Sequence, residues 1–441
     1  MDLSDESERK GSDNLAYETS EHERNVVPTN NNDSHRVQVQ NTPPNQVRDP
    51  QLWRDLTAYW LLGLTNNYGY VVMLSAAHDI IKQFEKEDDG TGVHNDRQCN
   101  IVSTGAILLA DIIPSLMVKI VAPYIPFWVN IRVFLAILLQ IAGFLLVAFA
   151  EAEWMAILGV IATSASSGIG ETTFMAYTGK FNKNVISTWS SGTGGAGVIG
   201  SLSYAGLISA GLSPKNTMLV MLAFPAIESF AFWVVLRKPS GLYHEYQDSK
   251  DASESTRLTW PEEEPLVTWK DKLMYSGQLM KYMIPLTTVY LFEYFINQGM
   301  FELVYFENIF LDKESQYRWL NVDYQIGVFI SRSSVNLLTI NKLWLLSVFQ
   351  LVNVVYFLFE VIYFFTPSIW IIFAIVFWEG LLGGGAYVNT FYKMSKEVHP
   401  VRREFAMGCV VQSDSFGIAL AGFLSMPVHN AICSLPKPIR L

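Results

Sequence analysis

Segments of about twenty mostly apolar residues recur along this chain from residue 56 onward. The hydrocarbon core of a bilayer is about 30 Å thick, and an α-helix rises about 1.5 Å per residue, so about twenty apolar residues cross it once. The pattern therefore predicts an all-α polytopic membrane protein with about eleven transmembrane helices. We expect these helices near residues 56–80, 101–121, 127–149, 154–178, 188–211, 215–236, 282–307, 317–340, 343–365, 369–392 and 403–428.

Composition supports a protein that lies in lipid. Hydrophobic residues make up 50% of the 441 residues and charged residues only 16%, whereas soluble domains carry about 25% charged residues. No run of five basic residues and no zinc-ligand spacing occurs, so we expect no nucleic-acid partner. The three cysteines make no disulfide framework, although Cys99 and Cys433 can pair if both face one oxidising compartment.

Two polar stretches set the boundaries and the orientation of the chain. Residues 1–50 have Tyr17 as their only aromatic residue, which is typical of a disordered tail. The stretch 237–281 holds seven lysine and arginine residues, and such loops face the cytosol. We expect a disordered cytosolic tail (1–52), a six-helix bundle (53–236), a cytosolic loop (237–281), a five-helix bundle (282–428) and a short luminal tail (429–441).

The helices before and after the central loop carry similar features. Asn66-Asn67 in the first helix corresponds to Asn297-Gln298 in the seventh, and Asp111 in the second to Arg332 in the eighth. Parallel repeats around a site at mid-membrane are the plan of major facilitator transporters. This similarity favours a major-facilitator-like 6+5 architecture, with chance likeness between glycine-rich helices as the alternative.

The stretch 289–302 carries polar residues within an apolar run. Tyr290, Glu293 and Asn297 are spaced by three and four residues and so share one helix face. An acidic side chain at bilayer depth costs roughly 2.5–3.5 kcal/mol, so such a face must border a bundle interior or a water-filled path. We interpret it as part of a solute path; a structural polar seam between helices is the alternative.

Other polar groups lie within apolar windows. Arg332 is the central cation, and its planar guanidinium suits a carboxylate or phosphate ligand; a structural ion pair with one of the acids is the alternative. Lys119 and Glu360 lie near the ends of their windows, and we expect them to reach toward the membrane interface. The candidate substrate-path residues are Asn67, Asp111, Glu171, Glu293, Asn297, Gln298, Glu302, Arg332, Glu379, Asn389 and Asp414.

His78-Asp79 lies at the non-cytosolic end of the first helix. Because histidine titrates between pH 5 and 8, this pair is a candidate pH sensor in an acidic compartment. A histidine that is merely solvated is the alternative.

The central loop contains Glu262-Glu263-Glu264-Pro265-Leu266-Val267. Glu262 stands four residues before the aliphatic pair Leu266-Val267, as in the acidic dileucine signals that adaptor proteins read. We therefore expect adaptor proteins as partners at this loop.

Gly192, Gly194 and Gly197 form a G-x-G-x-x-G pattern. A dinucleotide site needs a strand before this pattern, and here the pattern lies inside a membrane-length run. The small residues predict close helix packing instead, and we expect no cofactor and no metal.

Several longer blocks of sequence resemble the battenin family. They span most of the predicted membrane region. The blocks are V-V-M-L-S-A-A-H-D-I (71–80), L-L-A-D-I (108–112), S-S-G-T-G-G-A-G (190–197), E-Y-F-I-N-Q-G (293–299), Q-Y-R-W (316–319), S-R-S-S (331–334), E-G-L-L-G-G (379–384), Y-V-N-T-F (387–391) and R-E-F-A-M (403–407).

This resemblance implies a lysosomal or late-endosomal membrane protein with a major-facilitator-like fold. It also implies efflux of glycerophosphodiesters and a contribution to lysosomal pH and basic amino-acid homeostasis. The chain departs from some battenins in one respect: eight residues follow Cys433, so we expect no C-terminal prenylation box.

Two functions are consistent with these features. The first is transport of a small polar solute, such as a phosphodiester, across the lipid bilayer; the second is a non-transporting scaffold for endolysosomal trafficking. Neither an H-E-x-x-H nor a G-x-S-x-G motif occurs, so we do not expect an enzyme.

Overall fold

The computed structural model describes residues 51–84, 104–125, 128–238, 265–266, 268–307, 309, 311, 313–438 and 440. Every regular element in these residues is a helix. The α-helices are α1 (Leu52–Phe84), α2 (Thr104–Val121), α3 (Val129–Ala148), α4 (Glu153–Tyr177), α5 (Asn184–Ser209), α6 (Pro214–Met221), α7 (Ala223–Phe230), α9 (Trp269–Gly299), α10 (Lys313–Arg332), α11 (Leu343–Tyr363), α12 (Ile369–Glu397), α13 (Pro400–Val410) and α14 (Gln412–Cys433). Short helical turns follow α2, α4, α7 and α9; they are η1 (Ala122–Tyr124), η2 (Thr178–Lys180), η3 (Ala231–Val235) and η4 (Phe301–Leu303).

Helix α3 shows how these helices divide their surface between protein and lipid. Its buried residues recur at spacings of three and four and include Val133, Gln140 and Phe144. The opposite face carries exposed apolar side chains, with Phe134 61% and Leu138 50% exposed. A water-soluble protein would place polar residues there, so the exposed face of α3 is suited to lipid.

Five helical segments in the described part of the chain are long and apolar enough to cross a bilayer. The remaining long helices are more polar, as in α4, where a run of serine and threonine residues is buried together with Glu171. The chain is an all-α, multi-pass membrane protein, and the number of eleven crossings stays a prediction. The five segments are Val129–Ala148, Pro214–Val235, Leu343–Tyr363, Ile369–Glu397 and Pro400–Cys433.

The sixth predicted helix, near 215–236, is interrupted at Leu222 between α6 and α7. Pro225 has no amide hydrogen to donate to the carbonyl of Met221, so the regular hydrogen-bond ladder fails at this point. The last predicted helix is likewise interrupted, at Val411 between α13 and α14.

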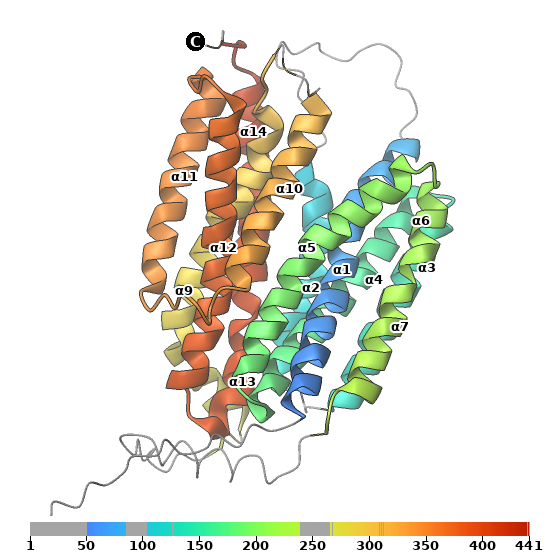
Figure 1. Ribbon diagram of the computed structural model, residues 1–441, viewed down its shortest axis with the longest axis vertical. Helices are drawn as coiled ribbons and strands as arrows, with labels where there is room; N and C mark the ends of the chain where they lie inside the picture. Colours follow the sequence, from blue (N-terminus) through green and yellow to red (C-terminus); the bar gives the residue numbers. More distant parts are fainter. Residues whose placement is uncertain are drawn as a thin grey trace, which may run out of the picture. The chain divides into compact units, whose positions relative to one another are not determined.

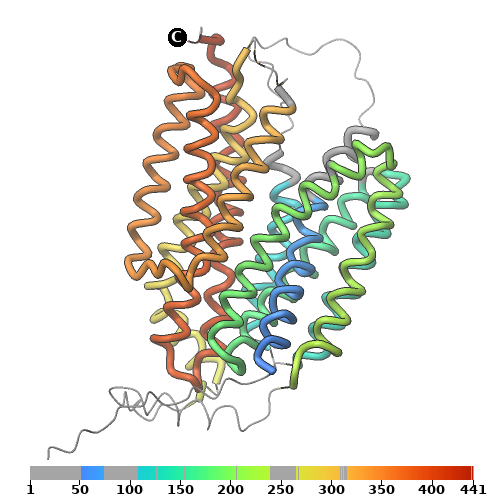
Figure 2. The backbone as a smooth tube through the Cα atoms, viewed as in Figure 1, coloured from blue at the N-terminus to red at the C-terminus, as the bar shows by residue number. Residues whose placement is uncertain are grey.

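The helices of residues 49–441, which form one compact unit, pack as two groups (Figure 1, Figure 2). In the first group α1 packs on α4 and α5, and α4 packs on α2 and α3. In the second group α9 packs on α11 and α14, and α10 packs on α12. The two groups meet where α5 lies along α10, α2 along α14, and α4 along α13.

The glycine pattern in α5 serves this packing, as predicted. A Cβ at Gly192 would meet the carbonyl oxygen of Trp60 on α1, and a Cβ at Gly197 would meet the Gln325 side chain on α10. Glycines here let α5 approach one helix of its own group and one of the other group.

Helix α9 begins thirteen residues before the predicted position of 282, so part of the predicted loop 237–281 is helical. Thr268 accepts a hydrogen bond from the Asp271 amide, and the Asp271 carboxylate accepts one from the Thr268 amide. This capping box fixes a helix start that hydropathy does not detect. The 31 residues of α9 span about 46 Å, so the first turns extend beyond the hydrocarbon core.

Helix α10 ends at Arg332, eight residues before the predicted end at 340. The hydroxyl of Ser333 donates to the carbonyl of Phe329 (2.7 Å), and that of Ser334 donates to the carbonyl of Ser331 (2.8 Å). Such local bonds compete with the helical ladder. As a result Arg332 stands at the end of a helix, where the chain leaves α10.

Candidate functional site

A cavity of about 90 Å³ lies between the two helix groups. Its wall is formed by α1, α2, α4 and α5 of the first group and by α9, α10 and α14 of the second. Most of the side chains that line it are polar, which suits water or a polar group rather than an apolar ligand. These polar side chains are Asn67, Tyr70, Ser115, Lys119, Ser167, Glu171, Thr193, Tyr290, Tyr294, Tyr324, Gln325, Arg332, Asp414 and Ser415.

Arg332 is held in the wall by neutral groups. It donates one hydrogen bond to the Thr193 hydroxyl (2.5 Å) and another to the Tyr290 hydroxyl (2.7 Å), and its guanidinium carbon lies 4.3 Å from the centre of the Tyr387 ring. Its Nε has no partner, and no carboxylate lies within 4.0 Å, among the residues that the structure describes. Among the described residues, Arg332 therefore forms no structural ion pair, and its guanidinium can still bind an anionic ligand.

Lys119 does not reach the membrane interface as the sequence suggested. Only 2% exposed, it lies 2.5 Å from a Glu171 carboxylate oxygen and 3.0 Å from an Asp414 oxygen, and it donates to the Ser415 hydroxyl at 2.7 Å. The prediction treated α2 as a helix standing alone, whereas α4 and α14 pack against it and supply two acids. The cluster joins α2 and α4 of the first group to α14 of the second.

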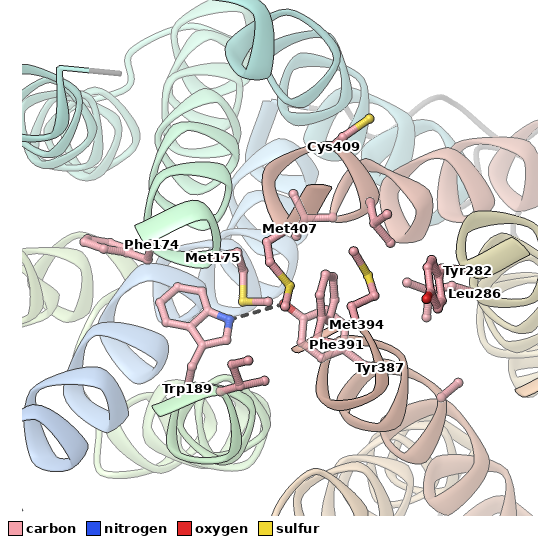
Figure 3. Close-up of a cluster of buried hydrophobic side chains, with 14 of the residues drawn as sticks. Phe174, Met175, Trp189, Tyr282, Leu286, Tyr387, Phe391, Met394, Met407 and Cys409 are labelled. Atoms are coloured by element: carbon pink, nitrogen blue, oxygen red, sulfur yellow. Dashed lines mark hydrogen bonds between the residues drawn. The ribbon is translucent and has the colours of Figure 1, made fainter. Parts of the chain in front are cut away.

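A second chain of contacts extends this cluster. The Tyr387 hydroxyl of α12 donates to Glu171 (2.7 Å) and accepts a hydrogen bond from the Trp189 indole of α5 (3.2 Å). Figure 3 shows this bond within a layer of buried side chains that includes Met175 from the first group and Met407 from the second. These contacts join α4 and α5 of the first group to α12 of the second beside Glu171, which lines the cavity.

Of the predicted path residues, four line the cavity: Asn67, Glu171, Arg332 and Asp414. Glu293 lies behind the wall, where it accepts a hydrogen bond from the hydroxyl of the lining residue Tyr324. Of the stripe at 290, 293 and 297, therefore, only Tyr290 contributes directly to the cavity surface.

The remaining predicted path residues lie away from the cavity surface. Asn389 has a structural role, since it accepts from the Ile340 amide (2.7 Å) and donates to the Gly385 carbonyl (2.8 Å). Glu302 lies on η4, just after α9. The other four are buried; they are Asp111, Asn297, Gln298 and Glu379.

Glu360 also differs from its predicted interfacial position. It is fully buried and accepts hydrogen bonds from the Arg440 guanidinium (2.7 Å) and from the Thr366 amide (2.9 Å). Arg440 stands near the end of the chain, so window position alone does not indicate this long-range pair.

Three predictions fall wholly or partly outside the described residues. The side chains of His78 and Asp79 lie outside them, as do Glu262 and Val267 of the proposed sorting signal, whose Leu266 is described. Cys433 is disulfide-bonded and Cys409 is free. Cys99, the partner predicted for Cys433, also lies outside the described residues.

The sequence interpretation missed most of the neutral residues of the site. Thr193 lies inside the glycine pattern, which indicated only packing, and Tyr324 and Tyr387 are among twenty tyrosines in the chain. One signal was available for Tyr324: it follows Asp323 and precedes Gln325, so polar residues cluster at mid-helix in an otherwise membrane-length segment.

Comparison with known proteins decides the family. The family model described as CLN3 protein matches residues 57–435, which is nearly the whole helical part. The chain belongs to the CLN3 protein family. Battenin of Canis lupus familiaris is 40% identical over 415 residues, which cover 89% of this chain and 94% of that protein.

Fungal members of the CLN3 protein family are similar over the same region. Protein btn-1 of Neurospora crassa is 35% identical over 86% of this chain and 88% of its own length, and Protein BTN1 of Saccharomyces cerevisiae is 34% identical over 85% and 94%. The resemblance to battenins is thus confirmed.

The fold is that of a solved transporter. The crystal structure of the human organic anion transporter MFSD10 (TETRAN) superposes with a TM-score of 0.59, covering 87% of this chain and 96% of that one at 10% identity. At this identity the similarity establishes the fold alone. The CLN3 family chain described here therefore has a major-facilitator-like fold, as predicted.

Proposed function

We propose that this protein is a membrane transporter of small polar solutes that bear an anionic group, with a glycerophosphodiester as the expected solute. The observation that carries the proposal is Arg332: a guanidinium in the wall of a cavity, held by hydroxyls and an aromatic ring rather than by a carboxylate.

A phosphodiester matches this surrounding. It carries one negative charge shared by two oxygens, which a planar guanidinium binds with two parallel hydrogen bonds. The hydroxyls of Thr193 and Tyr290, already directed at Arg332, are positioned to accept or donate to the same group. Glu171 and Asp414 in the same cavity suit the hydroxyl or cationic end of such a solute.

The architecture supports transport of a solute across the membrane. Major facilitator folds expose a site between two helix groups to each side of the membrane in turn. The cavity of this chain lies between its two groups, and the protein of similar fold, human MFSD10, is an organic anion transporter.

We place the protein in the lysosomal or late-endosomal membrane, where efflux of such solutes would contribute to lysosomal pH and basic amino-acid homeostasis. This part of the proposal rests on the battenin resemblance, together with the candidate adaptor signal in the loop 237–281. Colocalisation of the tagged protein with a lysosomal marker, as wild type and with Leu266→Ala, tests it.

The transport proposal is tested by counterflow uptake of radiolabelled glycerophosphocholine into proteoliposomes. We expect Arg332→Ala to lower the uptake rate at least about thirty-fold, because removing one partner of a desolvated charge pair usually costs 2 kcal/mol or more. Arg318→Ala is the matched control: this arginine lies on the same helix, donates to Ser315 (3.2 Å) and does not line the cavity.

Equal uptake by wild type, Arg332→Ala and empty liposomes would remove the transport proposal. The trafficking-scaffold hypothesis assigns function to the tail 1–52 and the loop 237–281 instead. It would gain support if those segments, grafted onto an inert membrane anchor, restored function to cells that lack the protein.

A further inference from the structure

Glu379 is an acid that forms no salt bridge with any residue that the structure describes. It lies on α12, is fully buried, and neither of its carboxyl oxygens has a hydrogen-bond partner among the described residues. Holding an ionised carboxylate in such surroundings costs several kcal/mol. Its position therefore requires the neutral, protonated form.

Glu293 of α9 lies beside it and is also buried, at 1% exposure. Its carboxylate packs against Gly383, one helical turn along α12 from Glu379, and a Cβ at that glycine would collide with it. The two carboxyl groups interact electrostatically. One oxygen of Glu293 accepts from Tyr324, and the other has no partner in the described part of the chain.

We propose that Glu293, backed by the protonated Glu379, binds the proton that is transported together with the anionic solute. Two neighbouring buried carboxyls with no bridging cation cannot both be ionised. Since neither carboxyl oxygen of Glu379 has a hydrogen-bond partner in the part of the chain that the structure describes, Glu293 is the member that gains and loses a proton. This inference rests on the transport function proposed above.

The hydroxyl of Tyr324 connects Glu293 to the cavity. Tyr324 lines the cavity and donates to the Glu293 carboxylate, so a proton delivered by cavity water reaches the carboxylate through this one hydroxyl. Tyr324 passes its own hydroxyl proton to the carboxylate and takes one from a hydronium ion in the cavity, so a carboxyl O–H bond forms while one O–H bond of the hydronium ion breaks and leaves water.

The surrounding charges supply the coupling. The charged groups that act on Glu293 are the cation Arg332 of α10 and the acid Asp414 of α14, and a nearby cation stabilises an ionised carboxylate. On α9 itself, the titratable groups that interact with Glu293 are the phenols of Tyr290 and Tyr294. An anion bound at Arg332 cancels the favourable charge, so Glu293 takes up a proton, and by reciprocity protonation of Glu293 strengthens anion binding.

Proton uptake on solute binding tests the proposal. Purified protein in weak buffer with a pH indicator is titrated with glycerophosphocholine. We expect wild type to take up about one proton per solute bound and its Kd to rise about tenfold per pH unit once Glu293 is ionised. Glu293→Gln should bind the solute with no proton uptake and with a Kd independent of pH.

Glu228→Gln is the matched control. Glu228 is also a buried glutamate with an unpartnered oxygen, but it lies on α7 and does not line the cavity. We expect this variant to keep the wild-type proton uptake. Uptake lost equally in both variants would show a general effect of removing buried acids and would overturn the assignment.

A second variant keeps the proposal testable if Glu293→Gln does not fold. Tyr324→Phe removes a hydrogen bond to the carboxylate, so the pH at which Kd begins to rise should move upward by about one unit. An unmoved pH profile would contradict the proposal. Solute binding by wild type without proton uptake refutes the coupling alone, whereas no binding by wild type refutes the transport function on which it rests.

Discussion

Arg332 and Lys119 are both buried cations of the cavity wall, but they contact different kinds of groups. Lys119 contacts two carboxylates, so its charge is compensated within the protein. Arg332 contacts two hydroxyls and a ring, so its charge is available to a ligand. We therefore propose that the buried cation Lys119 holds the helices together and that the buried cation Arg332 binds the solute.

The role assigned to Lys119 predicts a loss of stability. Lys119→Met leaves Glu171 and Asp414 buried near each other without their cation, which should lower the free energy of unfolding in mixed micelles by about 3–5 kcal/mol. Lys180→Met is the control, because the Lys180–Glu404 pair (3.1 Å) is more than one-third exposed and should contribute less than about 1 kcal/mol. Equal losses in the two variants would contradict the compensating role of Lys119.

Two glycines on α12 offer a sharp comparison. A Cβ at Gly383 would collide with the Glu293 carboxylate, whereas a Cβ at Gly385 meets nothing within 4 Å. Gly383→Ala should therefore destabilise the protein by about 1–3 kcal/mol, and Gly385→Ala should be neutral or slightly stabilising. Thermal unfolding of the two variants in one detergent distinguishes them; matching unfolding temperatures would count against the close approach of Glu293 to α12.

At the scale of elements, hydropathy predicts the helices but not where they stop. Helices α3 and α11 match the predicted windows 127–149 and 343–365 within two residues, because their sequences are apolar throughout. The start of α9 and the end of α10 differ from their predicted positions by eight residues or more, because side-chain hydrogen bonds of Thr268, Ser333 and Ser334 determine them.

The candidate site was likewise predictable from the sequence only in part. Arg332 and Glu171 were predictable, since a charge inside an apolar window needs a reason. The partnership of Lys119 with Asp414 joins residues 295 positions apart, and it depends on α2 packing along α14. No local pattern contains that information.

The capping box predicts a pH effect at the start of α9. Hydrogen bonds from Thr268 to the Asp271 carboxylate lower the pKa of Asp271. Because the pKa of Asp271 is lower in the folded chain, the capping box stabilises the helix fully at pH values above the pKa of Asp271 in the unfolded chain. This stabilisation is lost as the pH falls through the pKa of Asp271 in the folded chain. Thr268→Ala should speed amide exchange in the first turn by a factor of about 2 to 30 at neutral pH, and the difference from wild type should shrink in acid. Exchange in the middle of α9 serves as the internal control.

At the scale of the whole molecule, two helix groups within the unit 49–441 enclose a cavity whose wall is formed by residues from both groups. Contacts such as Lys119–Asp414 and Trp189–Tyr387 join the groups around it. A solute bound at Arg332 would touch Thr193 of the first group and Tyr290 of the second, so binding energy can bear on how the groups are arranged.

The most direct test of this account is equilibrium binding of radiolabelled glycerophosphocholine to the purified protein, compared with uncharged glycerol as competitor. We expect wild type to bind the phosphodiester, glycerol not to compete, and Arg332→Gln to weaken binding at least about thirty-fold with its unfolding temperature retained. Undiminished binding by a folded Arg332→Gln, or equal competition by glycerol, would contradict an anion site at Arg332.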